Sequence, residues 1–145
     1  MGGFQMNYQR IENHYVVKLD IGDEVIGSLT RLCAAEGIYA GTVSGIGATD
    51  RVKIGLFDLA KKRYDSAILT GPMEITSLLG NVTTKDGQPY LHLHIHVGNE
   101  KMEVSGGHLF ECFISVAGEI FITKLDGIIE RHLDPVLGLN LIDLH

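Results

Sequence analysis

The chain has 145 residues, 45% of them hydrophobic and 21% charged, which is an ordinary mixture for one globular domain. Its 18 acidic and 12 basic side chains give a formal charge of −6, a poor balance for holding the phosphates of a nucleic acid. No segment approaches the ~20 apolar residues that span a bilayer, so we expect no membrane partner.

Two further features bear on the compartment. The first ten residues have no apolar run after a basic start, so they do not resemble a signal peptide. Cys33 and Cys112 lie far apart in apolar contexts and are expected to be reduced core thiols. Together these features predict a cytoplasmic protein.

The first predicted elements are a strand and a helix. Residues 14–20 form a short segment rich in residues that favour β-structure, which predicts a strand. The next segment is predicted to be helical because apolar side chains recur along one stripe, at Val25, Ile26, Leu29, Leu32 and Cys33. Asp23 is the expected N-cap, and Gly37 is the expected C-terminal stop.

Strands follow, separated by glycines and turns. Residues 38–49 are rich in glycine but carry no phosphate-loop motif, so we expect bulges or close backbone approach there. Residues 51–58 and 63–70 flank the segment LAKK and predict a hairpin. Residues 73–84 and 90–98 flank an Asp-Gly turn signal and predict a second hairpin.

The last part of the chain predicts one long strand and an apolar tail. Residues 108–125 form that strand, with Gly118 as the expected break. The tail, residues 126–145, is apolar enough to dock on the body. One clear helix and six or more strands joined by tight turns predict a single α+β domain over residues 1–145, with a mainly antiparallel sheet and one principal helix packed on it.

Basic side chains gather weakly between residues 51 and 63. Asp50, Asp58 and Asp65 are interleaved with them, so the cluster resembles the solvated end of a hairpin more than a nucleic-acid surface. Its members are Arg51, Lys53, Lys61, Lys62 and Arg63.

The most informative segment is PYLHLHIHVG at residues 89–98. Side chains alternate faces along a strand, so His92, His94 and His96 share one face while the aliphatic residues between them point to the core. Neighbours on one face lie ~6.5–7 Å apart, so imidazoles at i and i+2 can lean onto one ion, whereas a third at i+4 lies ~13 Å from the first. The strand therefore supplies two ligands of a metal site, and a third must come from elsewhere.

His108 is the expected third ligand. It follows Gly106 and Gly107, which let the backbone pack closely, and it begins a strand that can pair with residues 91–97. Three imidazoles with one position left open are typical of catalytic zinc sites, so zinc is the expected ion, with nickel, iron or copper as alternatives. Glu74, in the adjoining hairpin, is the candidate for a carboxylate ligand or a catalytic acid or base.

The competing interpretation is a solvated polar face that happens to contain histidines. It would suffice for one histidine, but three that alternate and a fourth behind two glycines favour the metal site. His14, His132 and His145 are isolated, and each is expected to be either a surface side chain or a single histidine with its hydrogen bonds satisfied. We expect no covalent nucleophile, because there is no Gly-x-Ser-x-Gly motif and no cysteine with a basic partner nearby.

Five segments, in order, carry a resemblance to a known family: SGIGA (44–48), LTGPMEITSLLGNVT (69–83), PYLHLHIHVG (89–98), GGHL (106–109) and EIFI (119–122). They resemble the PPC domain, which plants and prokaryotes share, over a core of residues 14–125. The resemblance implies a compact α+β domain that forms a homotrimer, and prokaryotic members are described as predicted DNA-binding proteins. The family's histidines match His92, His94 and His108 here, whereas His96 is an addition.

The chain departs from plant members of the family in one respect. Plant members grip the minor groove of DNA through an AT-hook, a short Arg-Gly-Arg-Pro segment, and this chain has none. The fold family is also similar to part of acetolactate decarboxylase, a zinc enzyme whose metal is held by an H-x-H pair, a later histidine and a glutamate. His92, His94 and His108 fit that order, and Glu74 is a loose match for the glutamate.

Two classes of function follow. The first is a homotrimeric regulatory module that binds a metal ion, with DNA as a partner implied by the family and opposed by the charge. The second is a zinc-dependent enzyme, similar to a lyase or decarboxylase, acting on a small oxo- or hydroxy-acid ligand whose carbonyl the metal polarises. A structural metal that locks subunits together is a further alternative.

Overall fold

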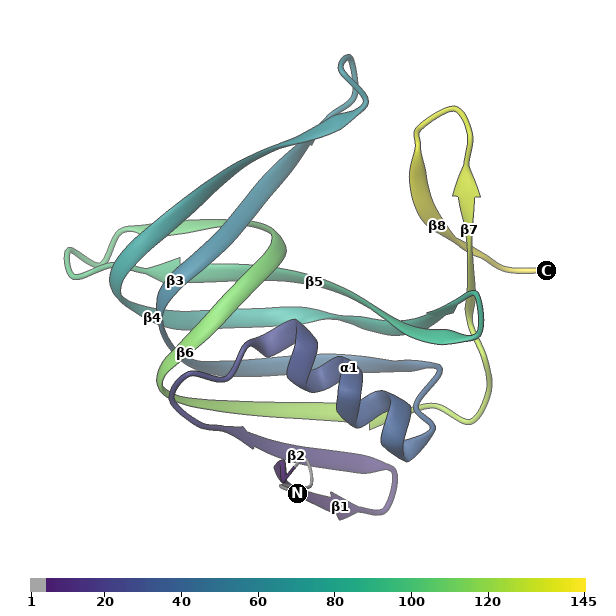
Figure 1. The fold of residues 1–145 in the computed structure, drawn as a ribbon, viewed down its shortest axis with the longest axis horizontal. Helices are drawn as coiled ribbons and strands as arrows, with labels where there is room; N and C mark the ends of the chain where they lie inside the picture. Colours follow the sequence, from purple (N-terminus) through teal and green to yellow (C-terminus); the bar gives the residue numbers. More distant parts are fainter. Residues whose placement is uncertain (1–4) are drawn as a thin grey trace.

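The computed structural model describes residues 5–145, so residues 1–4 of the predicted domain and of the N-terminal segment lie outside it. Within this range the chain forms one helix and eight strands (Figure 1). The elements are β1 (Asn7–Ile11), β2 (His14–Leu19), α1 (Val25–Glu36), β3 (Gly41–Asp58), β4 (Arg63–Lys85), β5 (Gln88–Gly98), β6 (Val104–Lys124), β7 (Glu130–Asp134) and β8 (Leu139–Asp143). The predicted α+β class with one principal helix is confirmed.

The strands pair into one sheet of order β1-β2-β6-β3-β4-β7-β8, with β5 joined to both β4 and β6. All pairings are antiparallel except a short parallel contact between Thr84 and Glu130, which attaches the C-terminal β7–β8 hairpin. Because β3 and β5 each pair with β4 and with β6, these four strands close into a hydrogen-bonded ring. Figure 1 shows α1 across one face of the sheet, with the β3–β4 hairpin and the β7–β8 hairpin projecting beyond it.

The long strands bend where glycines allow two backbones to touch. The β3–β4 register shifts between Gly45 and Gly47, and a Cβ added to Gly47 would lie 2.5 Å from the carbonyl oxygen of Ala117. A Cβ on Gly41 would lie 2.5 Å from the Thr123 carbonyl oxygen. The expectation of bulges and close approach in this segment is therefore confirmed.

Several predicted strands prove to be parts of longer ones. The two segments expected on either side of residue 50 form the single strand β3, and those on either side of residue 71 form β4. Gly118 does not break its strand, because β6 runs through it from Val104 to Lys124. The bend there is made by a register shift against β3, so the hydrogen-bonded ladder continues on both sides of it.

Both predicted hairpin turns are present. Asp86 and Gly87 link the paired residues Lys85 and Gln88, and their φ angles of 51° and 77° are those of a type I′ turn. The other turn, between Asp58 and Arg63, closes the β3–β4 hairpin. The tail docks as predicted, but it does so through β7 and the buried Arg131, whereas its apolar side chains Ile128, Leu133, Val136 and Leu144 are exposed.

Helix α1 buries the predicted stripe against the sheet. Val25, Leu29, Leu32 and Cys33 join the core with the inward side chains of β5. Gly37 ends the helix with a φ of 64°, as expected. The N-cap prediction was wrong by one residue: Glu24 caps the helix, while the side chain of Asp23 accepts a hydrogen bond from the backbone of Asp20 instead.

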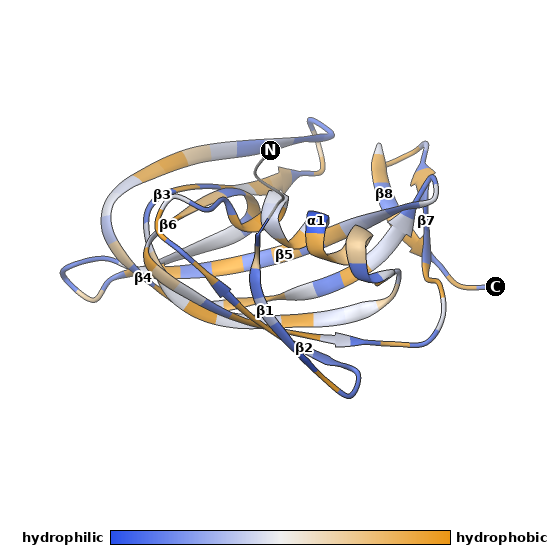
Figure 2. Ribbon diagram, turned by 60° about the horizontal axis from the view of Figure 1, so that its bottom comes forward, coloured by the Kyte–Doolittle hydropathy of each residue, from blue (hydrophilic) through white to orange (hydrophobic). Residues whose placement is uncertain are grey.

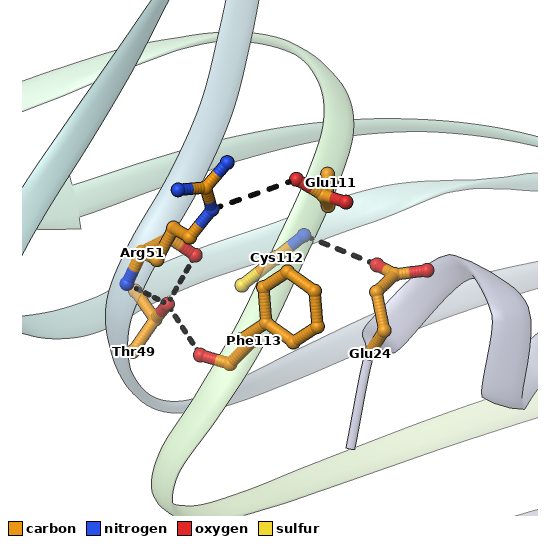
Figure 3. A network of polar contacts seen from close by, with 6 residues as sticks. All are labelled: Glu24, Thr49, Arg51, Glu111, Cys112 and Phe113. Carbon is orange, nitrogen blue, oxygen red and sulfur yellow. Dashed lines mark hydrogen bonds and ion pairs between the residues drawn. The ribbon is translucent and has the colours of Figure 1, made fainter. Parts of the chain in front are cut away.

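Glu24 also ties the helix to the sheet (Figure 3). Its Oε1 accepts from Gly27 N at 2.8 Å, and its Oε2 accepts from Ile26 N and from Cys112 N of β6, each at 3.1 Å. Beside it, the Thr49 hydroxyl lies 2.6 Å from the Phe113 carbonyl oxygen, at the point where β3 shifts register. A carboxylate and a hydroxyl thus satisfy backbone groups that the bent strands leave unpaired.

Hydrophobic and hydrophilic residues are interspersed along the strands, as the orange and blue segments of the ribbon in Figure 2 show. On β5 the aliphatic residues Leu93, Ile95 and Val97 are buried in the core, and the intervening histidines face the other way. Within residues 5–145, no helix is long and apolar enough to cross a membrane.

Candidate metal centre

The site is built on the outward face of β5. His92 is half-buried, whereas His94 and His96 are exposed. In the register with β4, His92 lies opposite Asn81 and His94 lies opposite Leu79, so these side chains share one face of the sheet. Strand alternation therefore places the histidines away from the core, as predicted.

The structure brings His108 to His92 and His94. His108 lies directly opposite His94 in the β5–β6 pairing. The ring centroids are 5.0 Å apart for His92 and His94, 5.2 Å for His92 and His108, and 5.7 Å for His94 and His108. One nitrogen from each ring lies within 4.8 Å of the others. Because a tetrahedral zinc ion holds its nitrogens about 3.3 Å apart, small side-chain rotations would close the set around one ion.

The glycine pair makes this approach possible. A Cβ on Gly107 would lie 2.7 Å from the carbonyl oxygen of Gly55, so β6 reaches its place beside both β3 and β5 only without a side chain there. A Cβ on Gly106 would lie 2.3 Å from Cδ2 of His96, whose ring therefore occupies the space over that glycine. His96 is not part of the converging set.

Aromatic side chains shield one side of the site. The ring of Tyr64 lies 4.6 Å from that of His108 at an interplanar angle of 33°, and Phe110 meets His108 edge-on at 4.8 Å. These contacts remove the imidazole of His108 from water. Burial is the main reason that its pKa falls to about 4, and the neighbouring His92 and His94 lower it further.

His92 is also held neutral. Its pKa is lowered first by burial, then by the positive charge of Arg131 and by His94. A neutral imidazole is the form that binds a metal ion, so His92 and His108 need lose no proton to do so near neutral pH. The site is therefore prepared for a cation by the same burial that makes protonation costly.

One atom of the site lacks a partner. Nδ1 of His108 is buried and has no hydrogen bond to any residue between 5 and 145. Leaving such an atom unsatisfied costs about 1–3 kcal/mol, and a metal ion bound by it would supply the missing partner. Three imidazoles suit zinc and other late transition metals, and the residues present fit such an ion.

Glu74 is not brought to the three histidines. It lies opposite Ala48 and Gly98, at the far end of β5, and its side chain is exposed. Among residues 5–145, the ligating group around His92, His94 and His108 contains histidines alone. The expectation of a nearby carboxylate from this residue is therefore not met.

Comparison with known proteins places the chain in a family. A family model for the Plants and Prokaryotes Conserved (PCC) domain, the PPC domain, matches residues 6–126. The chain belongs to the PCC family. Among curated proteins, none matches the chain.

Several solved structures are similar to this chain in sequence and in fold. A protein from Bacteroides thetaiotaomicron, described as a predicted DNA-binding protein, is 35% identical with a TM-score of 0.92, covering 95% of this chain and 96% of its own. A protein from Archaeoglobus fulgidus, described as metal-containing, is also 35% identical, with a TM-score of 0.85 and coverage of 99% and 100%. A PPC protein from Pyrococcus horikoshii is 34% identical, with a TM-score of 0.84 and coverage of 100% and 99%.

The sequence did not predict that Arg131 lies beside the three histidines. Arg131, on β7, lies beyond the matched family region and yet reaches the histidine face. Its Nη2 donates to Asn81 Oδ1 at 2.9 Å, and Asn81 is the residue opposite His92. A lone arginine in an apolar tail carries no sequence signal for this placement, because only the docking of the β7–β8 hairpin creates it.

A second group of potential ligands lies on the C-terminal hairpin. His132 and His145 place Nε2 at 3.7 Å and 3.0 Å from the same Oδ2 of Asp143. Both histidines are exposed, and such surface contacts are ion pairs only when the imidazoles are protonated. The expectation that His132 and His145 are isolated was therefore wrong, although both do lie on the surface.

Proposed function

We propose that this PCC protein binds a divalent transition metal, zinc foremost, through His92, His94 and His108, with at least one coordination position open to another ligand. The observation that carries the proposal is the convergence of three imidazoles, one with a buried, unsatisfied nitrogen. The metal-containing relative from Archaeoglobus fulgidus supports it. When bound, a zinc ion in such a site acts as a Lewis acid toward its open-position ligand.

The test is metal content and affinity. We expect elemental analysis of the purified protein after zinc loading to give one ion per chain, and calorimetric titration to show one tight site. His92→Ala and His108→Ala should each abolish this site. His14→Ala is the matched control, because His14 is exposed and its Nδ1 contacts Thr123 Oγ1 at 3.0 Å on another strand. Unchanged stoichiometry in both site variants would refute the proposal.

The same face of the sheet supports self-association, and we propose a homotrimer. One row of side chains crosses β6, β3, β4 and β5 on this face. In that order, its paired residues are Phe121, Ser44, Leu79 and His94. Leu79 is 56% exposed and Phe121 49% exposed, with Ile46 at 57% on the same face. Exposed apolar side chains gathered beside a site are typical of an interaction surface.

Light scattering measures the mass in solution directly. The expected wild-type mass is three chains, and Phe121→Glu should give single chains. Leu56→Glu is the control, because Leu56 is exposed on the distant β3–β4 hairpin. A monomeric wild-type protein would refute the proposed homotrimer, but it would not contradict the proposed metal site.

A DNA-associated regulatory role rests on the description of relatives such as the Bacteroides protein. The charges of the β3–β4 hairpin oppose binding through phosphates. Lys61 lies within 3.5 Å of Asp58 and 3.1 Å of Asp65, and Arg51 lies 3.7 Å from Glu111. Binding of the protein to mixed-sequence duplex DNA at several salt concentrations tests this role. An affinity that falls as the salt concentration rises would indicate contacts with phosphates, whereas no binding at ~50 mM salt would refute the DNA-binding role.

The second candidate function is a zinc-dependent lyase acting on a small oxo- or hydroxy-acid. It is favoured by the open coordination position together with a cationic side chain, Arg131, beside the histidines. Screening the metal-loaded protein against 2-oxo acids and acetolactate tests it. Turnover that disappears with chelator and returns with zinc would support an enzyme, whereas no turnover under any loading would leave a binding module.

A further inference from the structure

Arg131 is a buried cation without an anionic partner. It is 6% exposed, and no aspartate or glutamate between residues 5 and 145 forms an ion pair with it. Its contacts are all to neutral groups: Nε donates to Thr83 Oγ1 at 2.7 Å, Nη1 to the Asn140 carbonyl oxygen at 2.9 Å and Nη2 to Asn81 Oδ1 at 2.9 Å. A buried charge of this kind is costly unless an opposite charge accompanies it.

The guanidinium is fixed beside the metal ligands. Asn81, which accepts from Nη2, lies opposite His92 in the strand register, and directly opposite side chains have Cβ atoms about 5 Å apart. Tyr90, two residues before His92 on the same face of β5, lies with its ring centroid 5.1 Å from the Arg131 guanidinium carbon. Arg131 also lowers the pKa of His92, which agrees with this proximity.

Positive charge therefore accumulates here when a metal binds. The three histidine ligands are neutral, Glu74 stands at the other end of β5, and the guanidinium adds its charge to that of the ion. Repulsion between the two cations is strong on a half-buried face, where water screens poorly. An anion bound between the metal ion and the guanidinium would be attracted to both cations and would offset the repulsion between them.

We propose that the site takes a small carboxylate anion, held jointly by the open coordination position of the metal and by Arg131. This inference rests on the proposed metal function and names its ligand. A guanidinium has five N–H groups, and three of those on Arg131 are engaged, leaving one on each of Nη1 and Nη2. A planar pair of oxygens matches such a cation better than a point charge does.

The wild-type test is a coupled titration. Binding of Co²⁺ and Zn²⁺ is measured by calorimetry in a non-coordinating buffer with chloride, acetate, lactate or inorganic phosphate as the anion. We expect acetate or lactate to tighten metal binding about tenfold or more, and the metal to tighten carboxylate binding by the same factor, as linkage requires. Lactate should also change the visible absorption of the cobalt-loaded protein, since it enters the coordination shell.

Variants separate Arg131 from a merely structural role. Arg131→Met should abolish the coupling and, with chloride alone, should raise metal affinity because a repelling charge is gone. Arg131→Lys keeps the charge but not the paired N–H groups, so it should retain only part of the coupling. Arg63→Met, on the exposed tip of the β3–β4 hairpin, is the control and should behave as wild type. Circular dichroism verifies that each variant is folded.

The outcomes distinguish the two proposals. If wild-type protein binds no metal, the proposed function fails. If it binds metal but no carboxylate changes the affinity or the cobalt spectrum, this inference is overturned and the metal site stands. Coupling to phosphate but not to carboxylates overturns the assignment of the ligand. Because the wild-type measurement needs no variant, unfolding of Arg131→Met would not leave the inference untested.

Discussion

Acidification should destabilise the metal-free protein through His108. The imidazole has an ordinary pKa of 6.5 when unfolded and a pKa of about 4 in the folded chain, where burial and the neighbouring histidines resist its protonation. Between these values the unfolded chain binds more protons than the folded chain. The stability contributed by keeping this ring neutral is therefore complete above pH 6.5 and is lost as the pH falls toward 4.

The size of the effect follows from the two pKa values. Their difference corresponds to at most about 3 kcal/mol, and partial exposure of the ring reduces this to on the order of 2 kcal/mol. Urea unfolding in the presence of chelator at pH 7.5, 6.5, 5.5 and 4.5 measures it. His108→Phe, whose ring can pack between Tyr64 and Phe110, should lose about 2 kcal/mol less than wild type across this range.

His14→Phe changes an exposed histidine on β2, outside the site, so it should follow the wild-type dependence on pH. Aspartates and glutamates that titrate in the same range affect all three proteins alike. Equal losses of stability for wild type and His108→Phe would show that the burial of this ring does not control acid sensitivity.

Two further predictions concern the scaffold of the site. Glu24→Ala should lower the free energy of unfolding by about 2–4 kcal/mol, measured in urea, because it removes an N-cap and leaves Cys112 N unsatisfied; Asp23→Ala, outside the cap, should cost less. Gly80→Ala should weaken zinc binding in calorimetry, because its Cβ would lie 1.9 Å from the His92 carbonyl oxygen and push β5 away. Gly98→Ala, where the nearest atom is 3.6 Å away, should bind zinc as wild type does, and equal affinities in both variants would refute the argument.

Much of the histidine site was predictable because strand geometry is nearly fixed. Alternation placed the aliphatic residues of β5 inward and its histidines outward, and the spacing limited that strand to two convergent rings. The glycine pair before His108 pointed to a close backbone approach, which the contact of Gly107 with Gly55 bears out. These features are local, so the sequence alone carries them.

Long-range features could not be predicted in the same way. Bulges join segments that look like separate strands, because a register shift bends the ladder without ending it. The carboxylate of Glu24 caps the helix and also accepts from Cys112 N of β6. Cys112 is far from Glu24 in the sequence, so the residues near the helix start do not reveal this contact. Arg131 reaches the site only because its hairpin docks on β4 at Thr84.

The position of His96 explains why only three of the four histidines on this face converge. All four face the same side, but sheet pairing selects which can meet: His94 lies opposite His108, whereas His96 lies opposite Gly106. Since glycine has no side chain, the ring of His96 lies over it, with Cδ2 at 2.3 Å from where a Cβ would be, and it does not join the converging set. His96→Ala should therefore leave zinc affinity in calorimetry unchanged, because His96 lies outside the converging set. A loss of zinc affinity in His96→Ala would show that His96 takes part in the site.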